Sequence, residues 1–150
     1  MFFNIKMIPT YKDTIKFVPP ISEGYVVKIY DGDSITVASR LPYDASPLYR
    51  FSVRVLGIDC PEIRTKCKDE KQCAKMAKAH LEQLIMNQKV KLNVHGLDKY
   101  GRVLADVELL NDYQTVNIAE EMIKNRYAVA YAGGKKQPPP NWLEYHYNSK

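Results

Sequence analysis

Cysteine and histidine are scarce in this sequence, with three residues of each among 150. The cysteines, Cys60, Cys67 and Cys73, are odd in number and lack C-x-x-C spacing, which argues against a disulfide framework and against a zinc finger. We expect free thiols in a reducing, cytosol-like compartment, with a Cys67–Cys73 bridge across a loop as the alternative. The histidines stand far apart along the chain, so no catalytic histidine is predicted.

Long apolar runs are absent as well. No stretch of about 18 apolar residues occurs, so neither a transmembrane helix nor a membrane partner is predicted. The apolar N-terminal positions are interrupted by Lys6, Pro9, Lys12 and Asp13, which makes this stretch a poor secretory signal and favours an intracellular location. Residues 1–22 end in a Pro-Pro pair and are interpreted as an arm or linker.

The bulk composition describes one globular domain, which we place at residues 23–150 and expect to be monomeric. Hydrophobic residues make up 45% of the chain and charged residues 26%, as in an ordinary domain with a core of its own. Lys and Arg number 22 against 17 Asp and Glu, a net charge of +5. This excess favours a polyanionic partner such as nucleic acid, although many basic proteins bind none.

Hydrophobic periodicity predicts the order of the elements. The apolar residues of an amphipathic helix recur at 69–88, and Thr115 is predicted to cap a second helix, with a further helix starting near Trp142. Alternation with a period of two predicts five strands, at residues 25–29, 34–38, 51–58, 89–95 and 103–109. This order predicts a β-rich α+β fold, a five-stranded OB-fold β-barrel with two to three helices.

The stretch from Phe51 to Glu62, FSVRVLGIDCPE, stands out because charges close an otherwise apolar strand. Cys60-Pro61 ends it, since proline has no N–H to donate to a ladder. Arg54, Asp59 and Glu62 are costly there unless they meet a cation, an anion or each other. We interpret them as meeting a divalent metal ion and a phosphate.

Four short motifs occur in a fixed order: DGD at 31–33, R-x4-D-x2-E at 54–62, DKYGR at 98–102 and AVAY at 128–131. Together they make the chain resemble the staphylococcal nuclease (thermonuclease) family over roughly residues 23–132. DGD alone is a weak signal because any hairpin carries it, whereas all four at compatible spacing are specific.

Two short carboxylates, Asp33 and Asp59, are predicted at two strand ends, and such hard oxygen ligands suit Ca²⁺ or Mg²⁺ rather than zinc. The resemblance implies Ca²⁺, with the backbone carbonyl of Cys60 as a further ligand. Family members often carry threonine at this position, so the cysteine keeps the carbonyl and removes a hydroxyl.

The resemblance also implies catalytic roles for three residues. Glu62 would activate the attacking water, with an exposed acid after a proline as the bland alternative. Arg54 and Arg102 would clamp the scissile phosphate, because guanidinium groups donate parallel hydrogen bonds and stay charged. The alternatives are a salt bridge from Arg54 to Asp59 or Glu62, and a solvated turn position for Arg102.

Substrate contacts are implied for Lys99 and Tyr100, near a terminal phosphate of a bound nucleotide, and for Tyr131, near a base or sugar. Stacking on an aromatic ring contributes about 1–3 kcal/mol per base. Ordinary packing of Tyr131 is nearly as plausible, since the chain has 11 tyrosines. The basic pair Lys135-Lys136 is interpreted as solvated, with a contribution to a basic rim as the alternative.

The resemblance thus predicts a thermonuclease-like endonuclease, a Ca²⁺-dependent phosphodiesterase that hydrolyses DNA and RNA with little sequence preference and leaves 3′-phosphate ends. One alternative is a non-catalytic OB-fold module that only binds nucleic acid. Another is a protein-interaction domain that uses the 1–22 arm and the aromatic C-terminal tail.

Overall fold

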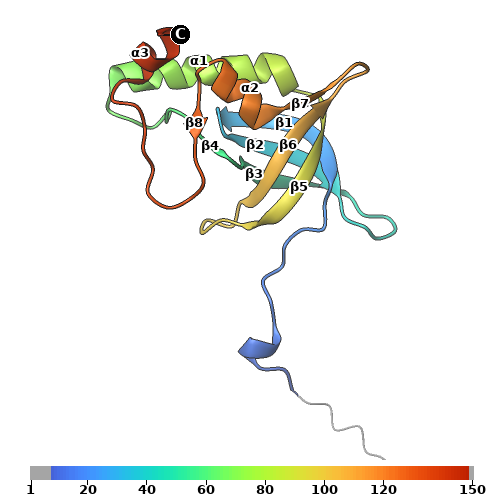
Figure 1. The fold of residues 1–150 in the computed structure, drawn as a ribbon. Helices are drawn as coiled ribbons and strands as arrows, with labels where there is room; N and C mark the ends of the chain where they lie inside the picture. The colour runs from blue at the N-terminus through green and yellow to red at the C-terminus, as the bar shows by residue number, and fades with distance from the viewer. Residues whose placement is uncertain (1–7, 149–150) are drawn as a thin grey trace, which may run out of the picture.

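The computed structural model describes residues 8–148, so the first part of the expected arm lies outside the described residues. Residues 8–18 are exposed and extend away from the body of the molecule, with one short 3-10 turn, η1, at Tyr11–Asp13 (Figure 1). The chain joins the body near Ile21, whose side chain is buried in the hydrophobic core. The division of the chain at residue 22 stays a prediction.

Five strands form a closed barrel. Their order is β3-β2-β1-β5-β6, and parallel pairing of β3 with β6 closes the cylinder. The predicted five-stranded OB-fold barrel is therefore confirmed. The strands are β1 (Glu23–Asp31), β2 (Ser34–Arg40), β3 (Leu48–Val55), β5 (Lys89–Leu97) and β6 (Val103–Leu110).

The barrel closes because alternate residues of each strand are apolar and point inward. Val53 and Val55 of β3, for example, are fully buried, whereas Ser52 of the same strand is exposed. The helix α1 (Lys68–Ile85) adds its apolar stripe to the same core. Core residues include Val26, Ile29, Ile35, Val37, Val53, Val55, Ala77, Leu81, Val107 and Met122.

The three helices lie together on one side of the barrel (Figure 1). The predicted cap at Thr115 is wrong: Thr115–Asn117 forms a short strand, β7, which pairs with the end of β6. The helix α2 (Ile118–Lys124) instead begins after Asn117, whose side chain accepts a hydrogen bond from the Glu120 amide at 3.0 Å. The third helix, α3 (Trp142–Tyr147), is present and short. No helix within residues 8–148 is both long and apolar enough to cross a membrane.

The strand predicted to continue through Ile58 ends earlier, at Val55. Leu56 and Gly57 form a turn, and the φ of Gly57 is 90°, a conformation that glycine adopts without strain. The chain then forms β4 (Ile58–Asp59), which pairs with β8 (Val129–Ala130) in a separate two-stranded sheet. This turn brings the end of β4 back beside the end of β3.

Candidate active site

Two buried carboxylates flank the side chain of Arg54. Asp33, in the turn between β1 and β2, is 6% exposed, and Asp59, at the end of β4, is 4% exposed. The Arg54 Nη2 atom lies 3.4 Å from Asp33 Oδ2 and 4.0 Å from Asp59 Oδ1. Sequence reasoning anticipated Asp59 or Glu62 as the salt-bridge partner of Arg54, and the structure shows Asp33 to be the nearer acid.

The turn after β3 fixes the orientation of the Arg54 guanidinium. Nη1 donates a hydrogen bond to the Val55 carbonyl at 2.8 Å, and Nη2 donates one to the Ile58 carbonyl at 2.9 Å. The two carbonyls lie on either side of the turn that contains Gly57. The bend of the backbone and the position of the buried Arg54 guanidinium therefore depend on each other. The Arg54 Nε–H makes no hydrogen bond to any residue between 8 and 148.

Asp33 is held by three neighbours. Its Oδ2 accepts a hydrogen bond from the Cys60 amide at 3.1 Å, and its Oδ1 accepts one from the Ser34 hydroxyl at 3.0 Å. Its own amide donates to Asp31 Oδ1 at 3.2 Å. Burial, together with the charges of Asp33 and Asp31, raises the pKa of the Cys60 thiol, so this side chain stays neutral.

The three aspartates around Arg54, which are Asp31, Asp33 and Asp59, carry more negative charge than this arginine neutralises. Burial, and then the Asp33 carboxylate, raise the pKa of Asp31 to about 7. Burial also raises the pKa of Asp59, although the ammonium of Lys136 opposes the shift. The Asp59 Oδ1 atom is buried and receives no hydrogen bond within the described part of the chain. Such an arrangement favours a cation at this point.

Lys136 supplies one positive charge at this point, and its position shows that the interpretation of Lys135-Lys136 as a solvated pair is wrong for Lys136. Its Nζ lies 3.2 Å from Asp59 Oδ1 and 3.3 Å from Glu62 Oε1, so the ammonium lies between the two acids. The geometry at Asp59 is that of an ion pair rather than a hydrogen bond. Nothing in the local sequence signalled this contact, because the loop between β8 and α3 brings it from far along the chain (Figure 1).

Glu62 lies at the solvent edge of the cluster. Its side chain is 57% exposed, in contrast to the buried aspartates, and therefore has access to water. Its amide donates a hydrogen bond to Glu70 Oε2 at 2.9 Å, which ties the loop after β4 to the first turn of α1.

Arg102 is placed by Asp98, a member of the DKYGR motif to which sequence reasoning gave no role. Arg102 Nε donates to Asp98 Oδ2 at 2.6 Å, and the Arg102 and Tyr100 amides donate to Asp98 Oδ1 at 2.9 Å and 2.8 Å. Burial alone would raise the pKa of Asp98, but these hydrogen bonds lower it. Arg102 Nη1 also donates to Ser34 Oγ at 3.0 Å, and that hydroxyl donates to Asp33. Arg102 is therefore not a solvated turn residue.

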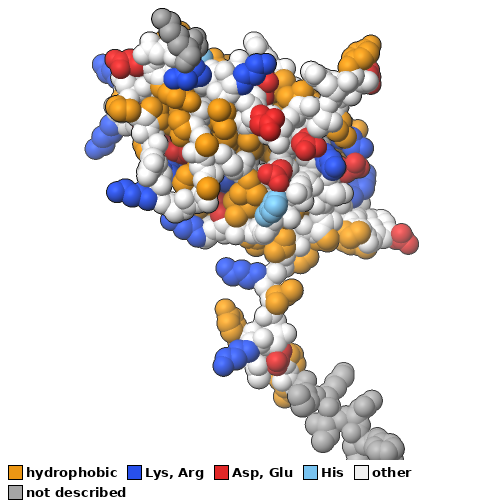
Figure 2. All heavy atoms as spheres, viewed as in Figure 1, with side chains coloured by type: hydrophobic (Ala, Val, Ile, Leu, Met, Phe, Trp, Pro, Cys, Tyr) orange, Lys and Arg blue, Asp and Glu red, His pale blue; other side chains and the backbone are white. Residues whose placement is uncertain are grey.

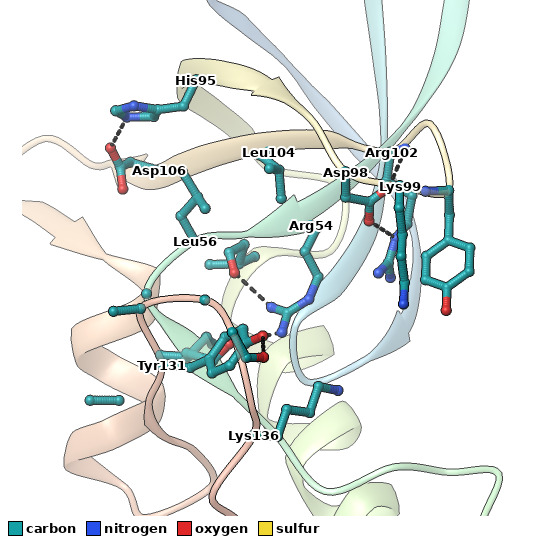
Figure 3. A pocket seen from close by; sticks show the side chains of 18 residues that line it. Arg54, Leu56, His95, Asp98, Lys99, Arg102, Leu104, Asp106, Tyr131 and Lys136 are labelled. Carbon is teal, nitrogen blue, oxygen red and sulfur yellow. Dashed lines mark hydrogen bonds and ion pairs between the residues drawn. The ribbon is translucent and has the colours of Figure 1, made fainter.

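A groove of about 1180 Å³ runs past the two arginines and Lys136. Both arginines line it, Lys99 lies at the same end as Arg102, and Tyr131 lies across from Arg54 (Figure 3). Tyr100 also lines the groove, with its ring centre 5.6 Å from the guanidinium carbon of Arg102. The Lys99 Nζ is 5.1 Å from the centre of the Tyr100 ring, and the Tyr131 hydroxyl donates to the Gly134 carbonyl at 2.7 Å. All three residues for which substrate contacts were expected thus share one groove.

The donor set beside the groove fits a hard divalent cation. Asp33 and Asp59 offer carboxylate oxygens from two sides of Arg54, and Asp59 Oδ1 has no hydrogen-bond donor among residues 8–148. No three His, Cys, Asp or Glu side chains in that same range form a complete metal cage by themselves. Carbonyl, water or phosphate oxygens would have to complete the coordination, as Ca²⁺ and Mg²⁺ permit.

Comparison with known proteins gives consistent matches. A family model for staphylococcal nuclease homologues matches residues 52–146, more than half of the chain. A protein named as a probable endonuclease in Verticillium alfalfae is 31% identical over 81 residues, which are 54% of this chain and 28% of that protein. One named likewise in Schizosaccharomyces pombe is 30% identical over 128 residues, covering 73% of this chain and 56% of that protein.

A protein of Oryza sativa named as a probable staphylococcal-like nuclease is 32% identical over 89 residues, covering 59% of this chain. The chain spans 28%, 56% and 22% of the lengths of these three relatives. The match therefore concerns a domain that the relatives carry within longer proteins.

Proposed function

Because the chain belongs to the staphylococcal nuclease family, we propose that it is a hydrolase that cleaves the phosphodiester bonds of DNA and RNA in the groove lined by Arg54 and Arg102. The observation that carries this proposal is the convergence of both guanidinium groups on Asp33, one through an ion pair and one through Ser34. The four motifs that suggested the family are far apart in sequence, and the family match includes three of them.

The two arginines would bind the scissile phosphate. Each is anchored on one side and keeps donors for a ligand: Arg54 Nε and Arg102 Nη2 make no hydrogen bond to any described residue. A guanidinium with fixed geometry stabilises the extra negative charge that develops on a phosphate under attack. Arg54 is largely buried, which strengthens this interaction because water screens it less.

Glu62 would accept the proton of the attacking water. The oxygen of water would bond to phosphorus, and the bond from phosphorus to the 5′ oxygen would break in line with it. The 5′ oxygen would take a proton from solvent, so that one product ends in a 3′-phosphate and the other in a 5′-hydroxyl. Glu62 is exposed to water beside Lys136, which lines the groove, and this position supports the role.

A Ca²⁺ ion would be held by Asp33, Asp59 and the backbone carbonyl of Cys60. When bound, it supplies positive charge that polarises a phosphate oxygen. The buried Asp59 Oδ1 supports this assignment, since it attracts the Lys136 ammonium to 3.2 Å and accepts no well-formed hydrogen bond from any described residue. The Cys60 side chain contributes nothing polar there, and its amide holds Asp33 in position.

The test is the release of acid-soluble nucleotides from DNA and from RNA, with Ca²⁺ and with a chelator. We expect Ca²⁺-dependent release from both substrates. Glu62→Gln should lower the rate at least about a hundredfold, the usual size of a general-base contribution, while oligonucleotide binding survives. Binding without any cleavage by the unaltered protein would favour the non-catalytic OB-fold module, and cleavage in the chelator would exclude the Ca²⁺ requirement.

A further inference from the structure

One end of the groove carries a histidine–aspartate pair for which the proposed reaction has no use. His95 and Asp106 both line the groove, and the His95 Nε2 lies 2.8 Å from Asp106 Oδ2. The pair lies at the end opposite Lys99 and Arg102, with Leu56 and Leu104 between (Figure 3). In the space-filling view, acidic side chains lie over β6 and α2, and basic ones lie around the loop after β8 and also near the helices and at the far edge of the barrel (Figure 2). The two ends of the groove therefore differ in charge, with Lys99 and Arg102 at one end and the Asp106 carboxylate at the other.

The sheet register places Asp106 a fixed step from the phosphate clamp. Arg54 of β3 pairs with Leu104 of β6, and the Leu56 amide donates to the Ala105 carbonyl at 2.9 Å. Residues two apart in a strand share one face, so Asp106 follows Leu104 on the groove side, about 7 Å along β6. This step is within reach of the nucleoside attached to a phosphate that Arg54 binds.

A β-bulge aims the histidine at the carboxylate. The pairing of β5 with β6 shifts between Val94 and Gly96, so that His95 is the extra residue, and the φ of Gly96 is 143°. Bulges next to binding sites commonly redirect one side chain. Asn93, the register partner of Asp106, also donates to Asp106 Oδ2, at 3.3 Å.

These contacts occupy only one oxygen of the carboxylate. Asp106 Oδ2 takes both hydrogen bonds, and no residue between 8 and 148 donates to Oδ1. An ionised carboxylate accepts hydrogen bonds and donates none, and it repels phosphate. Within a DNA strand, the group that suits it is an N–H donor on a base edge, because the deoxyribose and the phosphate carry no donor. Leu56, Leu104 and Tyr131 offer apolar surface for the base itself.

We infer that Asp106, held in place by His95 and Asn93, selects the base next to the scissile phosphate and favours bases with an exocyclic amino group. Cytosine, adenine and guanine carry such an amino group, at N4, N6 and N2 respectively, whereas thymine and uracil have carbonyl oxygens and no amino group. His95 is a positioning residue that fixes the carboxylate. The inference rests on the proposed function and modifies it: cleavage is not indifferent to sequence.

The experiment is partial digestion of a random-sequence single-stranded DNA library, followed by sequencing of the new ends. At one of the two positions flanking the cut, we expect amino-bearing bases over thymine by roughly fivefold, the lower end of what one base contact gives. Asp106→Asn, which has the same shape but also donates, should bring this ratio close to one. His95→Gln should reduce it in part.

Glu108→Gln is the matched control. It removes one negative charge from β6, two residues further on, and Glu108 does not line the groove. This variant should keep the base ratio of the unaltered protein. A pair that serves only to join β5 to β6 would lower the melting temperature on substitution and leave the base ratio unchanged, and that result would overturn the inference, as would equal use of thymine by the unaltered protein.

Failure of the proposed function is separable from failure of this inference. If no form of the protein cleaves DNA, fluorescence anisotropy in a chelator compares the binding of oligo-dC with that of oligo-dT at mildly alkaline pH. We expect the unaltered protein to bind oligo-dC roughly fivefold more tightly, and Asp106→Asn to lose the difference. Equal affinities for the unaltered protein would refute base selection even in a protein that only binds.

Discussion

Asp33 is the residue on which the charged groups of the site converge. Its carboxylate forms an ion pair with Arg54, accepts a hydrogen bond from the Cys60 amide, and is linked to Arg102 through the Ser34 hydroxyl. DGD alone is a weak signal in a sequence, because turn chemistry explains it equally well. The three-dimensional arrangement adds what the motif lacks, since Asp31 and Asp33 crowd one another beside a buried arginine.

The crowding predicts an unusual pH dependence for the metal-free protein. Burial and Asp33 raise the pKa of Asp31 to about 7 from an ordinary 3.8, so the folded state binds this proton more tightly than the unfolded state does. The stabilisation is complete below the ordinary pKa and is lost as the pH rises through about 7. Metal-free protein should therefore lose stability between mildly acidic and mildly alkaline pH.

Asp31→Asn removes the group that titrates. In a chelator at mildly alkaline pH, this variant should be more stable than the unaltered protein by up to about 4 kcal/mol, and the difference should vanish in acid. Urea unfolding across the pH range measures both. Asp44→Asn, an exposed loop acid, is the control and should change little. Equal stability of Asp31→Asn and the unaltered protein at alkaline pH would contradict this account.

At the scale of elements, the turn between β3 and β4 positions the buried arginine. Gly57→Ala should destabilise the protein by about 1–2 kcal/mol, because the φ of 90° strains any residue with a Cβ. Steric conflict is not the cause, since the nearest atom to the new Cβ is that of Ala119 at 3.9 Å. Gly57→Asn should cost less, because asparagine tolerates positive φ. Thermal unfolding of the two variants measures the difference, and an equal loss of stability in both would rule out backbone strain as the cause.

The start of α2 is a second test at this scale. Asn117→Ala removes the side chain that caps the helix, so we expect a loss of about 1 kcal/mol in unfolding free energy. Thr115→Ala should cost clearly less, because Thr115 is an exposed strand residue with no capping contact. A larger loss at Thr115 than at Asn117 would restore the sequence-based assignment of the cap. Urea titration of both variants gives the comparison.

Sequence periodicity predicted the barrel because strands such as β6 alternate cleanly, with Val103, Ala105 and Val107 buried, and the barrel needs that alternation to bury one face. It failed at Thr115, where three residues of β7 are too short to show a period and tertiary pairing with β6 decides. It also extended β3 past Val55, because apolar Leu56 and Ile58 continue the pattern across the Gly57 turn.

At the scale of the whole molecule, the site depends on contacts that join distant parts of the chain. The residues implied by the motifs lie in one groove or beside it, because barrel closure through β3 and β6 brings Arg54 and Arg102 together. Lys136 had no such signal, since a lysine in a loop with glycine neighbours is typical of a solvated surface. The contact of His95 had no sequence signal either, because a β-bulge rather than a motif turns its side chain toward Asp106.

The central claim is that the acids and the guanidinium groups bind a divalent ion and a phosphate together. Calorimetric titration of the full chain with Ca²⁺, with and without a nuclease-resistant dinucleotide analogue, measures that coupling most directly. We predict that the analogue tightens Ca²⁺ binding about tenfold, a coupling of about 1.4 kcal/mol, and that Arg54→Met abolishes the coupling. Ca²⁺ binding that is indifferent to the analogue, or that survives Asp33→Asn combined with Asp59→Asn, would contradict it.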